Sequence, residues 1–287
     1  MPSIPFQALA CPLDGQPLAL VENNTWCCAA GHSFDIARQG YVNLLPVQHK
    51  RSQDPGDSKA MVAARQRFLQ AGHYQPLAEA ISRYVATWAA RQPSGAEGFS
   101  CLDAGCGEGY YLRRLAHGVP NELALIGLDI SKWAVMAAAK QDDKQAPVSR
   151  WVVGSNAHLP VQPAALDGAL CMFGFPVYGE FARVLKSGGV LLQVEAGAQH
   201  LRELREVIYP QLKPERSPAL EVPEGFAYID EETLSYPIRL EGQQAIADLL
   251  AMTPHLYRAS AEGRARAAEL DQLAITVDVR LVQWARR

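Results

Sequence analysis

Residues 102–109 read Leu-Asp-Ala-Gly-Cys-Gly-Glu-Gly and, about twenty residues later, residues 125–131 read Leu-Ile-Gly-Leu-Asp-Ile-Ser. A short apolar run therefore ends in a glycine loop, a helical pattern follows, and a second apolar run ends in Asp129. This order predicts a βαβ unit that holds a nucleoside-like ligand at the ends of two parallel strands. We expect the Asp129 carboxylate to accept hydrogen bonds from both hydroxyl groups of a ribose.

The glycine spacing separates two classes of cofactor. Gly105, Gly107 and Gly109 alternate, whereas a dinucleotide site has the spacing Gly-x-Gly-x-x-Gly and directs a helix N-terminus at a pyrophosphate. Glycine has no Cβ, so such a loop can turn sharply and approach a ligand closely. With Asp103 before it, the loop resembles motif I of the class I S-adenosylmethionine (SAM) methyltransferases, whose ligand is a sulfonium without phosphate. The alternative is a glycine-rich turn in an unrelated α/β fold.

The composition is that of an ordinary soluble globular protein. The 287 residues suffice for one α/β domain and a small appendage, and 48% are hydrophobic while 20% are charged. We expect no membrane span and no secretory signal, and six scattered cysteines favour the reducing cytoplasm. The net charge of −3 excludes a globally basic nucleic-acid binder, so a polyanionic partner requires a local basic patch.

Residues 1–45 have the pattern of a small zinc-ribbon-like hairpin module. Cys11-Pro-Leu-Asp14 is followed by Cys28 and then by His32, which gives two ligands, a loop and two further ligands. This spacing indicates a zinc site, although Asp14 stands where a second thiolate is usual. The alternative is a hairpin without metal that is held together by ordinary packing.

Residues 46–90 are predicted to form a basic linker followed by helices. Lys50 and Arg51 lie in a polar, proline-bearing stretch, and Arg65 and Arg67 are expected on one exposed side of the first helix. These four side chains are suited to a phosphate backbone. A solvated helix face explains the same composition.

Residues 91–287 are predicted to form a Rossmann-like domain with a mostly parallel sheet. The predicted strands span 101–104, 123–129, 149–154, 166–173 and 190–195, with a final strand over 274–283 at the antiparallel edge, and two short strands over 17–21 and 24–28 in the hairpin module. The predicted helices span 59–69, 76–90, 109–118, 133–141, 178–185, 200–208 and 243–252, with an irregular stretch between the last two. Lys-Ser-Gly-Gly at 186–189 is interpreted as a helix stop.

The loop after the third predicted strand of this domain resembles the segment that cups the adenine in SAM enzymes. We assign Ser155, Asn156 and Ala157 to it. That loop often has an acidic residue where this chain has Ser155, so we expect Asn156 or backbone amides to contact the base edge. The cofactor site is thus predicted to extend across three neighbouring strand ends.

The loop after the strand over 166–173 is predicted to face the methyl acceptor. Phe175 lies at its exposed tip, where an aromatic ring can stack on a flat substrate. Phe173 fits this role and that of a core aromatic equally well. No Ser-His-Asp or Cys-His nucleophile is evident, and methyl transfer from SAM requires none, since the protein mainly aligns acceptor, methyl group and sulfur.

Several strings along the chain coincide with one family. They are Cys11-x2-Asp14 with Cys28-x3-His32-Ser-Phe-Asp35, Gly-Tyr-Val-Asn-Leu-Leu-Pro-Val-Gln-His-Lys-Arg at 40–51, Asp-Pro-Gly-Asp-Ser at 54–58, Ala-Gly-His-Tyr at 71–74, Tyr-Pro-Ile-Arg-Leu at 236–240 and Met-Thr-Pro at 252–254. These strings resemble the bacterial 23S rRNA (guanine-N1)-methyltransferases, which modify a guanine in the hairpin loop of helix 35. The similarity covers nearly the whole chain.

This resemblance implies a zinc-binding N-terminal RNA module, a SAM-binding catalytic domain and a homodimer. By position, Tyr74 and His200 match family residues that lie against SAM or the acceptor pocket. Asp14 departs from the family pattern because it replaces a zinc cysteine, which bears on metal loading and on RNA affinity. The resemblance favours RNA contact for some of the basic residues Lys50, Arg51, Arg65 and Arg67.

The SAM motif and the family resemblance together imply methyl transfer from SAM to N1 of a guanine in a 23S rRNA hairpin loop. We expect the base to be splayed from its loop and inserted near Phe175. A protonated guanine N1 is a weak nucleophile, so His200 is a candidate either for a base or for a group that stabilises negative charge at O6. The alternatives are a small-molecule methyltransferase, for example for a quinone precursor, and a non-catalytic RNA-binding assembly protein that retains SAM affinity.

Overall fold

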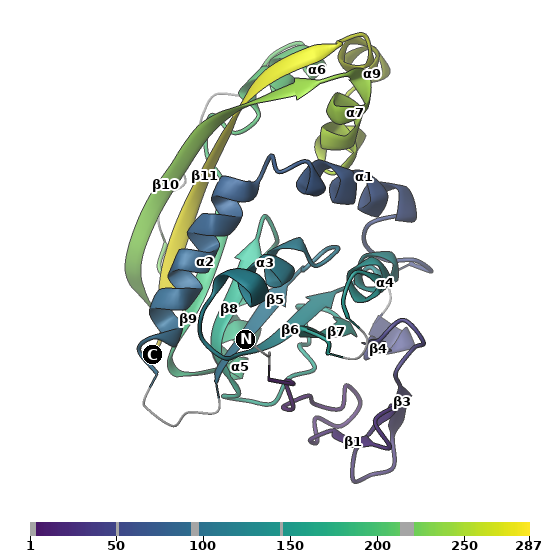
Figure 1. The fold of residues 1–287 in the computed structure, drawn as a ribbon, viewed down its shortest axis with the longest axis vertical. Helices are drawn as coiled ribbons and strands as arrows, with labels where there is room; N and C mark the ends of the chain where they lie inside the picture. The colour runs from purple at the N-terminus through teal and green to yellow at the C-terminus, as the bar shows by residue number, and fades with distance from the viewer. Residues whose placement is uncertain (1–3, 50–51, 93–97, 144–145, 213–220) are drawn as a thin grey trace.

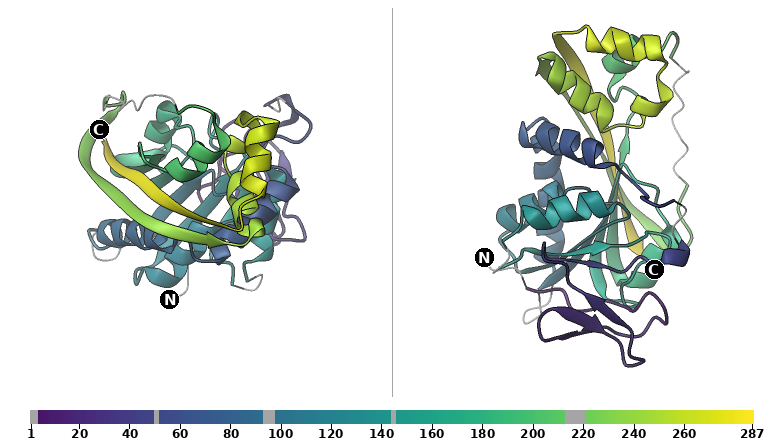
Figure 2. Two further views of the ribbon diagram at one scale, coloured as in Figure 1. Left: turned by 90° about the horizontal axis from the view of Figure 1, so that it is seen from above. Right: turned by 90° about the vertical axis from the view of Figure 1, so that its right-hand side faces the viewer.

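A computed structural model describes residues 4–49, 52–92, 98–143, 146–212 and 221–287 of the chain (Figure 1). These residues form a large sheet with helices on both faces and a small three-stranded sheet in the N-terminal part. Two strands of the large sheet form a long antiparallel pair that extends beyond its other strands (Figures 1 and 2). The predicted Rossmann-like fold with a small hairpin module is confirmed.

The large sheet has the topology of a doubly wound fold. Its strands are β4 (Tyr41–Asn43), β5 (Phe99–Ala104), β6 (Leu123–Asp129), β7 (Ser149–Val153), β8 (Leu166–Met172), β9 (Leu185–Ala196), β10 (Phe226–Glu241) and β11 (Gln272–Arg286), in the order β10-β11-β9-β8-β5-β6-β7-β4. The strands β4 to β9 pair in parallel, whereas β11 is antiparallel to both β9 and β10. The strand order reverses between β5 and β8, and ligands bind outside the carboxyl ends of strands at such a switch point.

The helices cover both faces of this sheet. They are α1 (Lys59–Gln70), α2 (Gln75–Ala89), α3 (Tyr110–Gly118), α4 (Lys132–Lys140), α5 (Tyr178–Val184), α6 (Arg202–Ile208), α7 (Gln243–Ala251), α8 (His255–Arg258) and α9 (Ala261–Ala268). Helix α2 buries Leu77, Ile81 and Val85, which recur every fourth residue and therefore share one helix face, against one side of the sheet. Helix α5 buries Phe181 on the opposite side. None of the helices in the described ranges is long and apolar enough to cross a bilayer.

The N-terminal hairpin module packs against the large sheet. Its strands β1 (Ala19–Val21), β2 (Thr25–Cys27) and β3 (Ser33–Asp35) are antiparallel, and β3 was not predicted. Trp26 is fully buried, and the Arg150 guanidinium from β7 lies over its ring at 5.5 Å. The next strand, β4, already belongs to the large sheet, because Tyr41 to Asn43 pair with β7. The module is therefore joined to the sheet by main-chain pairing as well as by apolar packing.

The C-terminal strands differ from the prediction. Strand β11 is not the edge of the sheet, because β10 pairs with it along its whole length on the outer side. The predicted irregular stretch thus contains the longest strand among the described residues, β10. Beyond the part of β11 that pairs with β9, the two strands continue to the group formed by α6, α7 and α9, at the top of Figure 1. Helix α1 packs against α7 from below.

The segment at 186–189 also differs from the prediction. Helix α5 ends at Val184, two residues before Lys186, and the four residues lie inside β9. Gly188 has a φ of 76°, and the pairing of β9 with β8 is irregular next to this segment. The glycines therefore allow a distortion at the start of a strand rather than ending a helix.

The packing of β6 against β7 generates a stability prediction. A Cβ on Gly127 would lie 2.6 Å from the buried Trp151 ring, whose Nε1 donates to Asp142 at 2.7 Å and is thereby held in place. We expect Gly127→Ala to lower the free energy of unfolding by about 1–3 kcal/mol through overpacking. Urea unfolding measures this change.

The control for this prediction is Gly179→Ala on helix α5. A Cβ there meets no described atom within 4 Å. Since alanine favours a helix, this variant should unfold at an unchanged or slightly higher urea concentration. Equal unfolding midpoints for Gly127→Ala and the unsubstituted protein would show that the β6–β7 contact is less tight than described.

Candidate functional site

The glycine loop between β5 and α3 is tied to the end of β6. The Gly105 N–H donates to the Leu128 carbonyl at 2.8 Å. Gly105 has a φ of 91°, and a Cβ there would meet no described atom within 4 Å, so the loop leaves space for a ligand at this point. Gly109 differs, because a Cβ there would lie 2.5 Å from the Trp151 ring. Gly105 therefore provides room for a ligand, whereas Gly109 is required by packing.

Asp129 lies at the end of β6 and faces the glycine loop. Its Oδ2 accepts a hydrogen bond from the Gly107 N–H at 3.0 Å, and its Oδ1 accepts one from the Ser131 N–H at 2.8 Å. Burial raises the pKa of Asp129, and these two N–H groups act in the opposite direction. Each oxygen retains a second lone pair, so the carboxylate can also accept hydrogen bonds from ligand hydroxyl groups.

Two other predicted cofactor residues have buried polar atoms without a partner. Asp103 is fully buried, and neither of its carboxyl oxygens has a hydrogen-bond partner among the described residues. Burial, with a smaller contribution from Asp129, raises the pKa of Asp103 to about 8. The Oδ1 atom of Asn156, in the loop after β7, is likewise buried and unpartnered. Such atoms are rare in native proteins, and a bound polar ligand would explain both.

Arg65 is not the exposed surface residue that was expected. It is half-buried and forms an ion pair with Asp57, while its Nη2 donates to the Met252 carbonyl at 3.3 Å. Its side chain also lies 3.5 Å from the position that a Gly107 Cβ would occupy. The position of Asp57 is fixed in turn by a hydrogen bond of 2.7 Å, which Ser131 Oγ donates to the Asp57 carbonyl oxygen. Arg65 therefore lies over the glycine loop.

Arg67 lies on a different side of α1 from Arg65. Two residues along an α-helix correspond to a rotation of about 200°, so the two side chains diverge. The Arg67 guanidinium donates two hydrogen bonds to the buried Asp248 on α7, at 2.9 and 2.6 Å. These bonds raise the pKa of Arg67. The expected shared basic face is therefore wrong for these two residues, and Lys50 and Arg51 lie outside the described ranges.

Three aromatic side chains meet beyond the ends of β8 and β9. The Phe173 ring stacks on the His200 ring, with 5.6 Å between centroids and 28° between planes. Tyr74, which precedes α2, lies 6.2 Å from Phe173, and its hydroxyl oxygen is 3.5 Å from His200 Nε2. Phe173 is 42% exposed and Phe175 is 90% exposed. Phe173 is therefore not a core aromatic, and it, rather than Phe175, contacts His200.

His200 is held by the strand β11. Its Nδ1 accepts a hydrogen bond from the Asp278 N–H at 3.2 Å. Asp278 also accepts two hydrogen bonds from the loop before His200. The Gln199 N–H donates to Asp278 Oδ2 at 2.9 Å, and the Gly197 N–H donates to the Asp278 carbonyl oxygen at 2.8 Å. Burial lowers the pKa of His200 to about 4, although the Asp278 carboxylate partly opposes this shift. Sequence reasoning missed Asp278 because its contact with the histidine is a backbone N–H, which almost any residue supplies.

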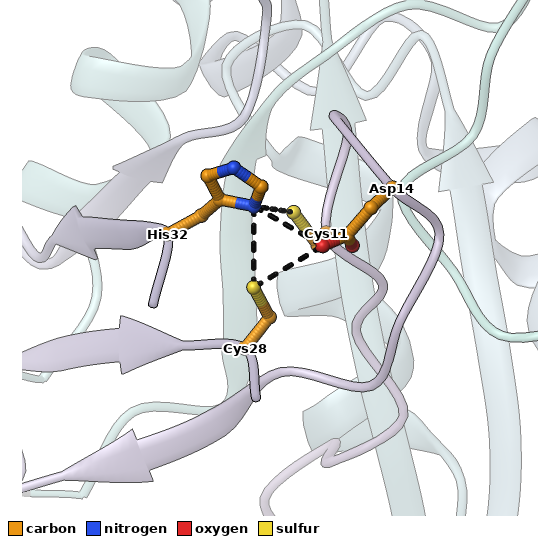
Figure 3. A group of neighbouring side chains, drawn as sticks. All are labelled: Cys11, Asp14, Cys28 and His32. Atoms are coloured by element: carbon orange, nitrogen blue, oxygen red, sulfur yellow. Dashed lines mark hydrogen bonds and ion pairs between the residues drawn. The ribbon is translucent and has the colours of Figure 1, made fainter. Parts of the chain in front are cut away.

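The four predicted metal ligands converge in the hairpin module (Figure 3). His32 Nδ1 lies 3.5 Å from Cys11 Sγ, 3.3 Å from Cys28 Sγ and 3.1 Å from Asp14 Oδ2. Cys28 Sγ is 3.4 Å from the same aspartate oxygen, and all four ligand atoms lie within 4.8 Å of one another. Asp14 thus occupies the position of a fourth ligand despite its departure from the family pattern.

These separations can be compared with a zinc site. Zinc–ligand bonds of about 2.0–2.3 Å in a tetrahedron place neighbouring ligand atoms about 3.3–3.8 Å apart. Three of these four separations lie within that range, and the fourth, from His32 to Asp14, is slightly shorter at 3.1 Å. A hydrogen bond from the Gln16 N–H lowers the pKa of Asp14, which favours the ionised form that a metal binds. The donor set therefore fits zinc.

Comparisons with known proteins agree with both parts of the chain. A family profile for a zinc ribbon, described as RlmA, N-terminal, matches residues 9–53, and one described as methyltransferase domain matches residues 101–189. A Streptomyces fradiae protein named 23S rRNA (guanine(748)-N(1))-methyltransferase is 33% identical over 90% of this chain and 89% of its own. Bacillus subtilis YxjB is 32% identical over 96% of each chain, and a Micromonospora griseorubida protein is 37% identical over 68% of each. The Bacillus and Micromonospora proteins are both named putative 23S rRNA (guanine-N(1)-)-methyltransferase.

The environment of His200 predicts a pH dependence. We expect its ring to remain neutral until the pH approaches about 4. A histidine in the unfolded chain has a pKa near 6.5, so between these values the unfolded state binds a proton that the folded state does not. The resulting stability is present above about pH 6.5 and is lost as the pH falls towards 4.

His200→Gln removes this proton uptake and tests the prediction. In urea unfolding between pH 7.5 and 5, the variant should lose less of its free energy of unfolding than the unsubstituted protein. An NMR titration of the His200 ring provides the direct measurement. A midpoint near 6.5 for that ring would contradict the described burial.

Proposed function

Because the chain belongs to the 23S rRNA (guanine-N1)-methyltransferase family, we propose that it transfers the methyl group of SAM to N1 of a guanine in the helix 35 hairpin loop of 23S rRNA. The geometric observation that carries the SAM part of this proposal is the pair of unpartnered buried groups, on Asp103 near the end of β5 and on Asn156 in the loop after β7, together with the open glycine loop. An elongated polar ligand across β5, β6 and β7 would satisfy both groups.

SAM fits the donor site by its chemistry. Its cationic amino group suits the Asp103 carboxyl, its ribose hydroxyls suit Asp129, and its adenine offers an amino group to Asn156 Oδ1. When bound, SAM supplies an electrophilic methyl group. The complete set that we assign to the cofactor is Tyr74, Asp103, Gly105, Gly107, Gly109, Asp129, Ser155, Asn156, Ala157 and His200. Within it, Gly109 contributes indirectly, by allowing the loop to pack.

We place the guanine beside the exposed aromatic side chains after β8. Phe173 and Phe175 offer ring faces on which a splayed base can stack, and Phe173 adjoins His200. A base inside an RNA stack is not accessible to an enzyme, so the target has to leave its loop before methylation. The role of Phe175 near the acceptor is retained, with Phe173 added to it.

For RNA contact, the hairpin module and the linker remain our candidates. Lys50 and Arg51 keep this assignment as a prediction. Arg67 has a buried carboxylate partner with which a phosphate would have to compete, and Arg65 lies over the cofactor loop, so both are weaker candidates than before. Zinc, held by Cys11, Asp14, Cys28 and His32, would order the module that contacts RNA. A homodimer, which the family resemblance implies, and a cytoplasmic location, which the six scattered cysteines favour, remain predictions.

The proposed reaction is tested with a transcript of the helix 35 hairpin. We expect label from methyl-labelled SAM to enter the RNA, and nucleoside mass spectrometry to identify it as N1-methylguanosine. Asp129→Asn should weaken SAM binding, measured by calorimetry, by about tenfold or more, because a carboxylate acceptor for hydroxyl groups is lost. A primer-extension stop should appear at one guanine and be weaker with this variant.

Other outcomes of this experiment identify the alternative functions. Methylation of quinone precursors with none of the RNA would favour the small-molecule enzyme. Tight RNA binding without incorporation of label would favour the assembly protein. Either result would overturn the proposed reaction.

The zinc proposal is tested by metal content and competition. We expect one zinc per chain. In a chelator competition, Asp14→Cys should bind zinc more tightly than the unsubstituted protein, and Asp14→Ala should bind it less tightly. Thiolate is a preferred ligand in structural zinc sites, and removal of the carboxylate leaves three ligands. Equal affinity of Asp14→Ala and the unsubstituted protein would show that Asp14 is not a ligand.

A further inference from the structure

We propose that His200 serves the reaction as a neutral hydrogen-bond donor to the guanine O6, with its donor Nε2–H fixed by the backbone of Asp278. This inference rests on the proposed function, and it decides between the two roles, base or donor, that the sequence allows for His200. It also identifies Asp278 as a positioning residue.

The hydrogen bonds of the ring determine where its proton lies. The Asp278 N–H that points at Nδ1 is a backbone group and can only donate, so Nδ1 must present its lone pair. A neutral imidazole with an unprotonated Nδ1 carries its hydrogen on Nε2. Nε2 therefore has no lone pair with which to accept a proton from the substrate. In this arrangement Nε2–H donates to the Tyr74 hydroxyl oxygen, at the long distance of 3.5 Å.

The loop that carries His200 is built to keep this arrangement. Its backbone is anchored to β11 at three points, through Gly197, Gln199 and Leu201. A Cβ on Gly197 would lie 2.3 Å from the Asp278 carboxylate, so a side chain at this position would displace that carboxylate. Leu201 has a φ of 52°, a conformation that bulky residues rarely adopt. The histidine thus sits in a constrained turn, next to the partly exposed Phe173.

Phe173 shows a second constraint at the same place. It too has a left-handed backbone, with a φ of 53°, and this conformation directs its ring to stack on His200. Strained conformations of this kind persist where the surrounding structure fixes them, and they concentrate at functional sites. His200 covers only part of the Phe173 ring, because the two centroids are 5.6 Å apart, and a guanine on the uncovered part would lie beside the His200 ring edge. Its O6, adjacent to N1, is the acceptor that the Nε2–H can reach.

A donor at O6 assists this reaction for a chemical reason. As guanine N1 loses its proton to water, negative charge spreads over N1 and O6, and N1 becomes the nucleophile. The N1–methyl bond then forms while the methyl–sulfur bond breaks and its electron pair stays on sulfur. A neutral imidazole hydrogen-bonded to O6 stabilises that charge without giving up its own proton.

Carboxylates near the turn are already engaged. Glu195, at the end of β9, forms an ion pair with Arg280 at 2.8 Å. The Asp278 Oδ2 accepts from the Gln199 N–H. The His200 Nε2–H has only the long contact with the Tyr74 hydroxyl, at 3.5 Å, and the guanine O6 would replace this weak partner.

Two substitutions separate a donor from a base. Glutamine can place an amide N–H near the position of Nε2 but cannot act as a base, whereas glutamate at pH 8 is a base without a donor. We expect His200→Gln to retain single-turnover methylation of the hairpin within about tenfold, and His200→Glu to lose a factor of about 10²–10³. SAM affinity is measured by calorimetry for each variant, and methylation is then compared at saturating SAM, so that the comparison reports the methyl transfer itself. Higher activity of His200→Glu than of His200→Gln would overturn the proposal.

A change in the RNA provides a readout that does not depend on how well a variant folds. With 6-thioguanosine as the target, the acceptor oxygen is replaced by sulfur, a weak acceptor. We expect this replacement to slow the unsubstituted enzyme at least tenfold more than it slows His200→Ala. An equal effect in both enzymes would overturn the contact between His200 and O6. Absence of methylation by the unsubstituted enzyme on the natural hairpin would instead overturn the proposed function itself.

Discussion

The antiparallel pairing of β11 with β9 is the interaction on which the candidate site depends. Through it, the backbone of Asp278 reaches the loop after β9 and fixes the His200 ring. The same strand continues past β9 and supports the group of α6, α7 and α9. That group in turn contacts α1, where Arg67 meets Asp248 and Arg65 meets the Met252 carbonyl over the glycine loop. One strand thus positions parts of both the donor and the acceptor regions.

The central part of the fold follows from sequence because it rests on local patterns. The strand over 123–129 matches β6 at both ends, and the glycine loop lies between β5 and α3 as predicted. Strand β10 was missed for a physical reason. It lies at the sheet edge with one side exposed, it contains Pro237, and it is rich in charged residues, so it lacks the apolar run of a central strand. Its partner β11 was recognised from the alternation of apolar and polar residues over 274–283.

The candidate site likewise contains residues that the sequence predicts and residues that it does not. Asp103, Asp129 and the four ligand atoms of the hairpin module were predictable because each belongs to a short motif with fixed spacing. Arg65 was not, since its half-burial depends on Asp57 and on a carbonyl that lies 187 residues further along the chain. The exposure of Phe173 and its contact with His200 depend on a left-handed backbone that no residue type at that position indicates.

The short strand β4 has a consequence for how the chain assembles. It pairs with β7, where Trp151 lies opposite Tyr41 and is therefore synthesised 110 residues later. During translation the hairpin module emerges first, yet its link to the sheet has to wait until β7 has left the ribosome. Contacts between such distant residues form slowly. We therefore expect the amino-terminal part of the nascent chain to gain its final anchorage late, after the centre of the sheet has formed.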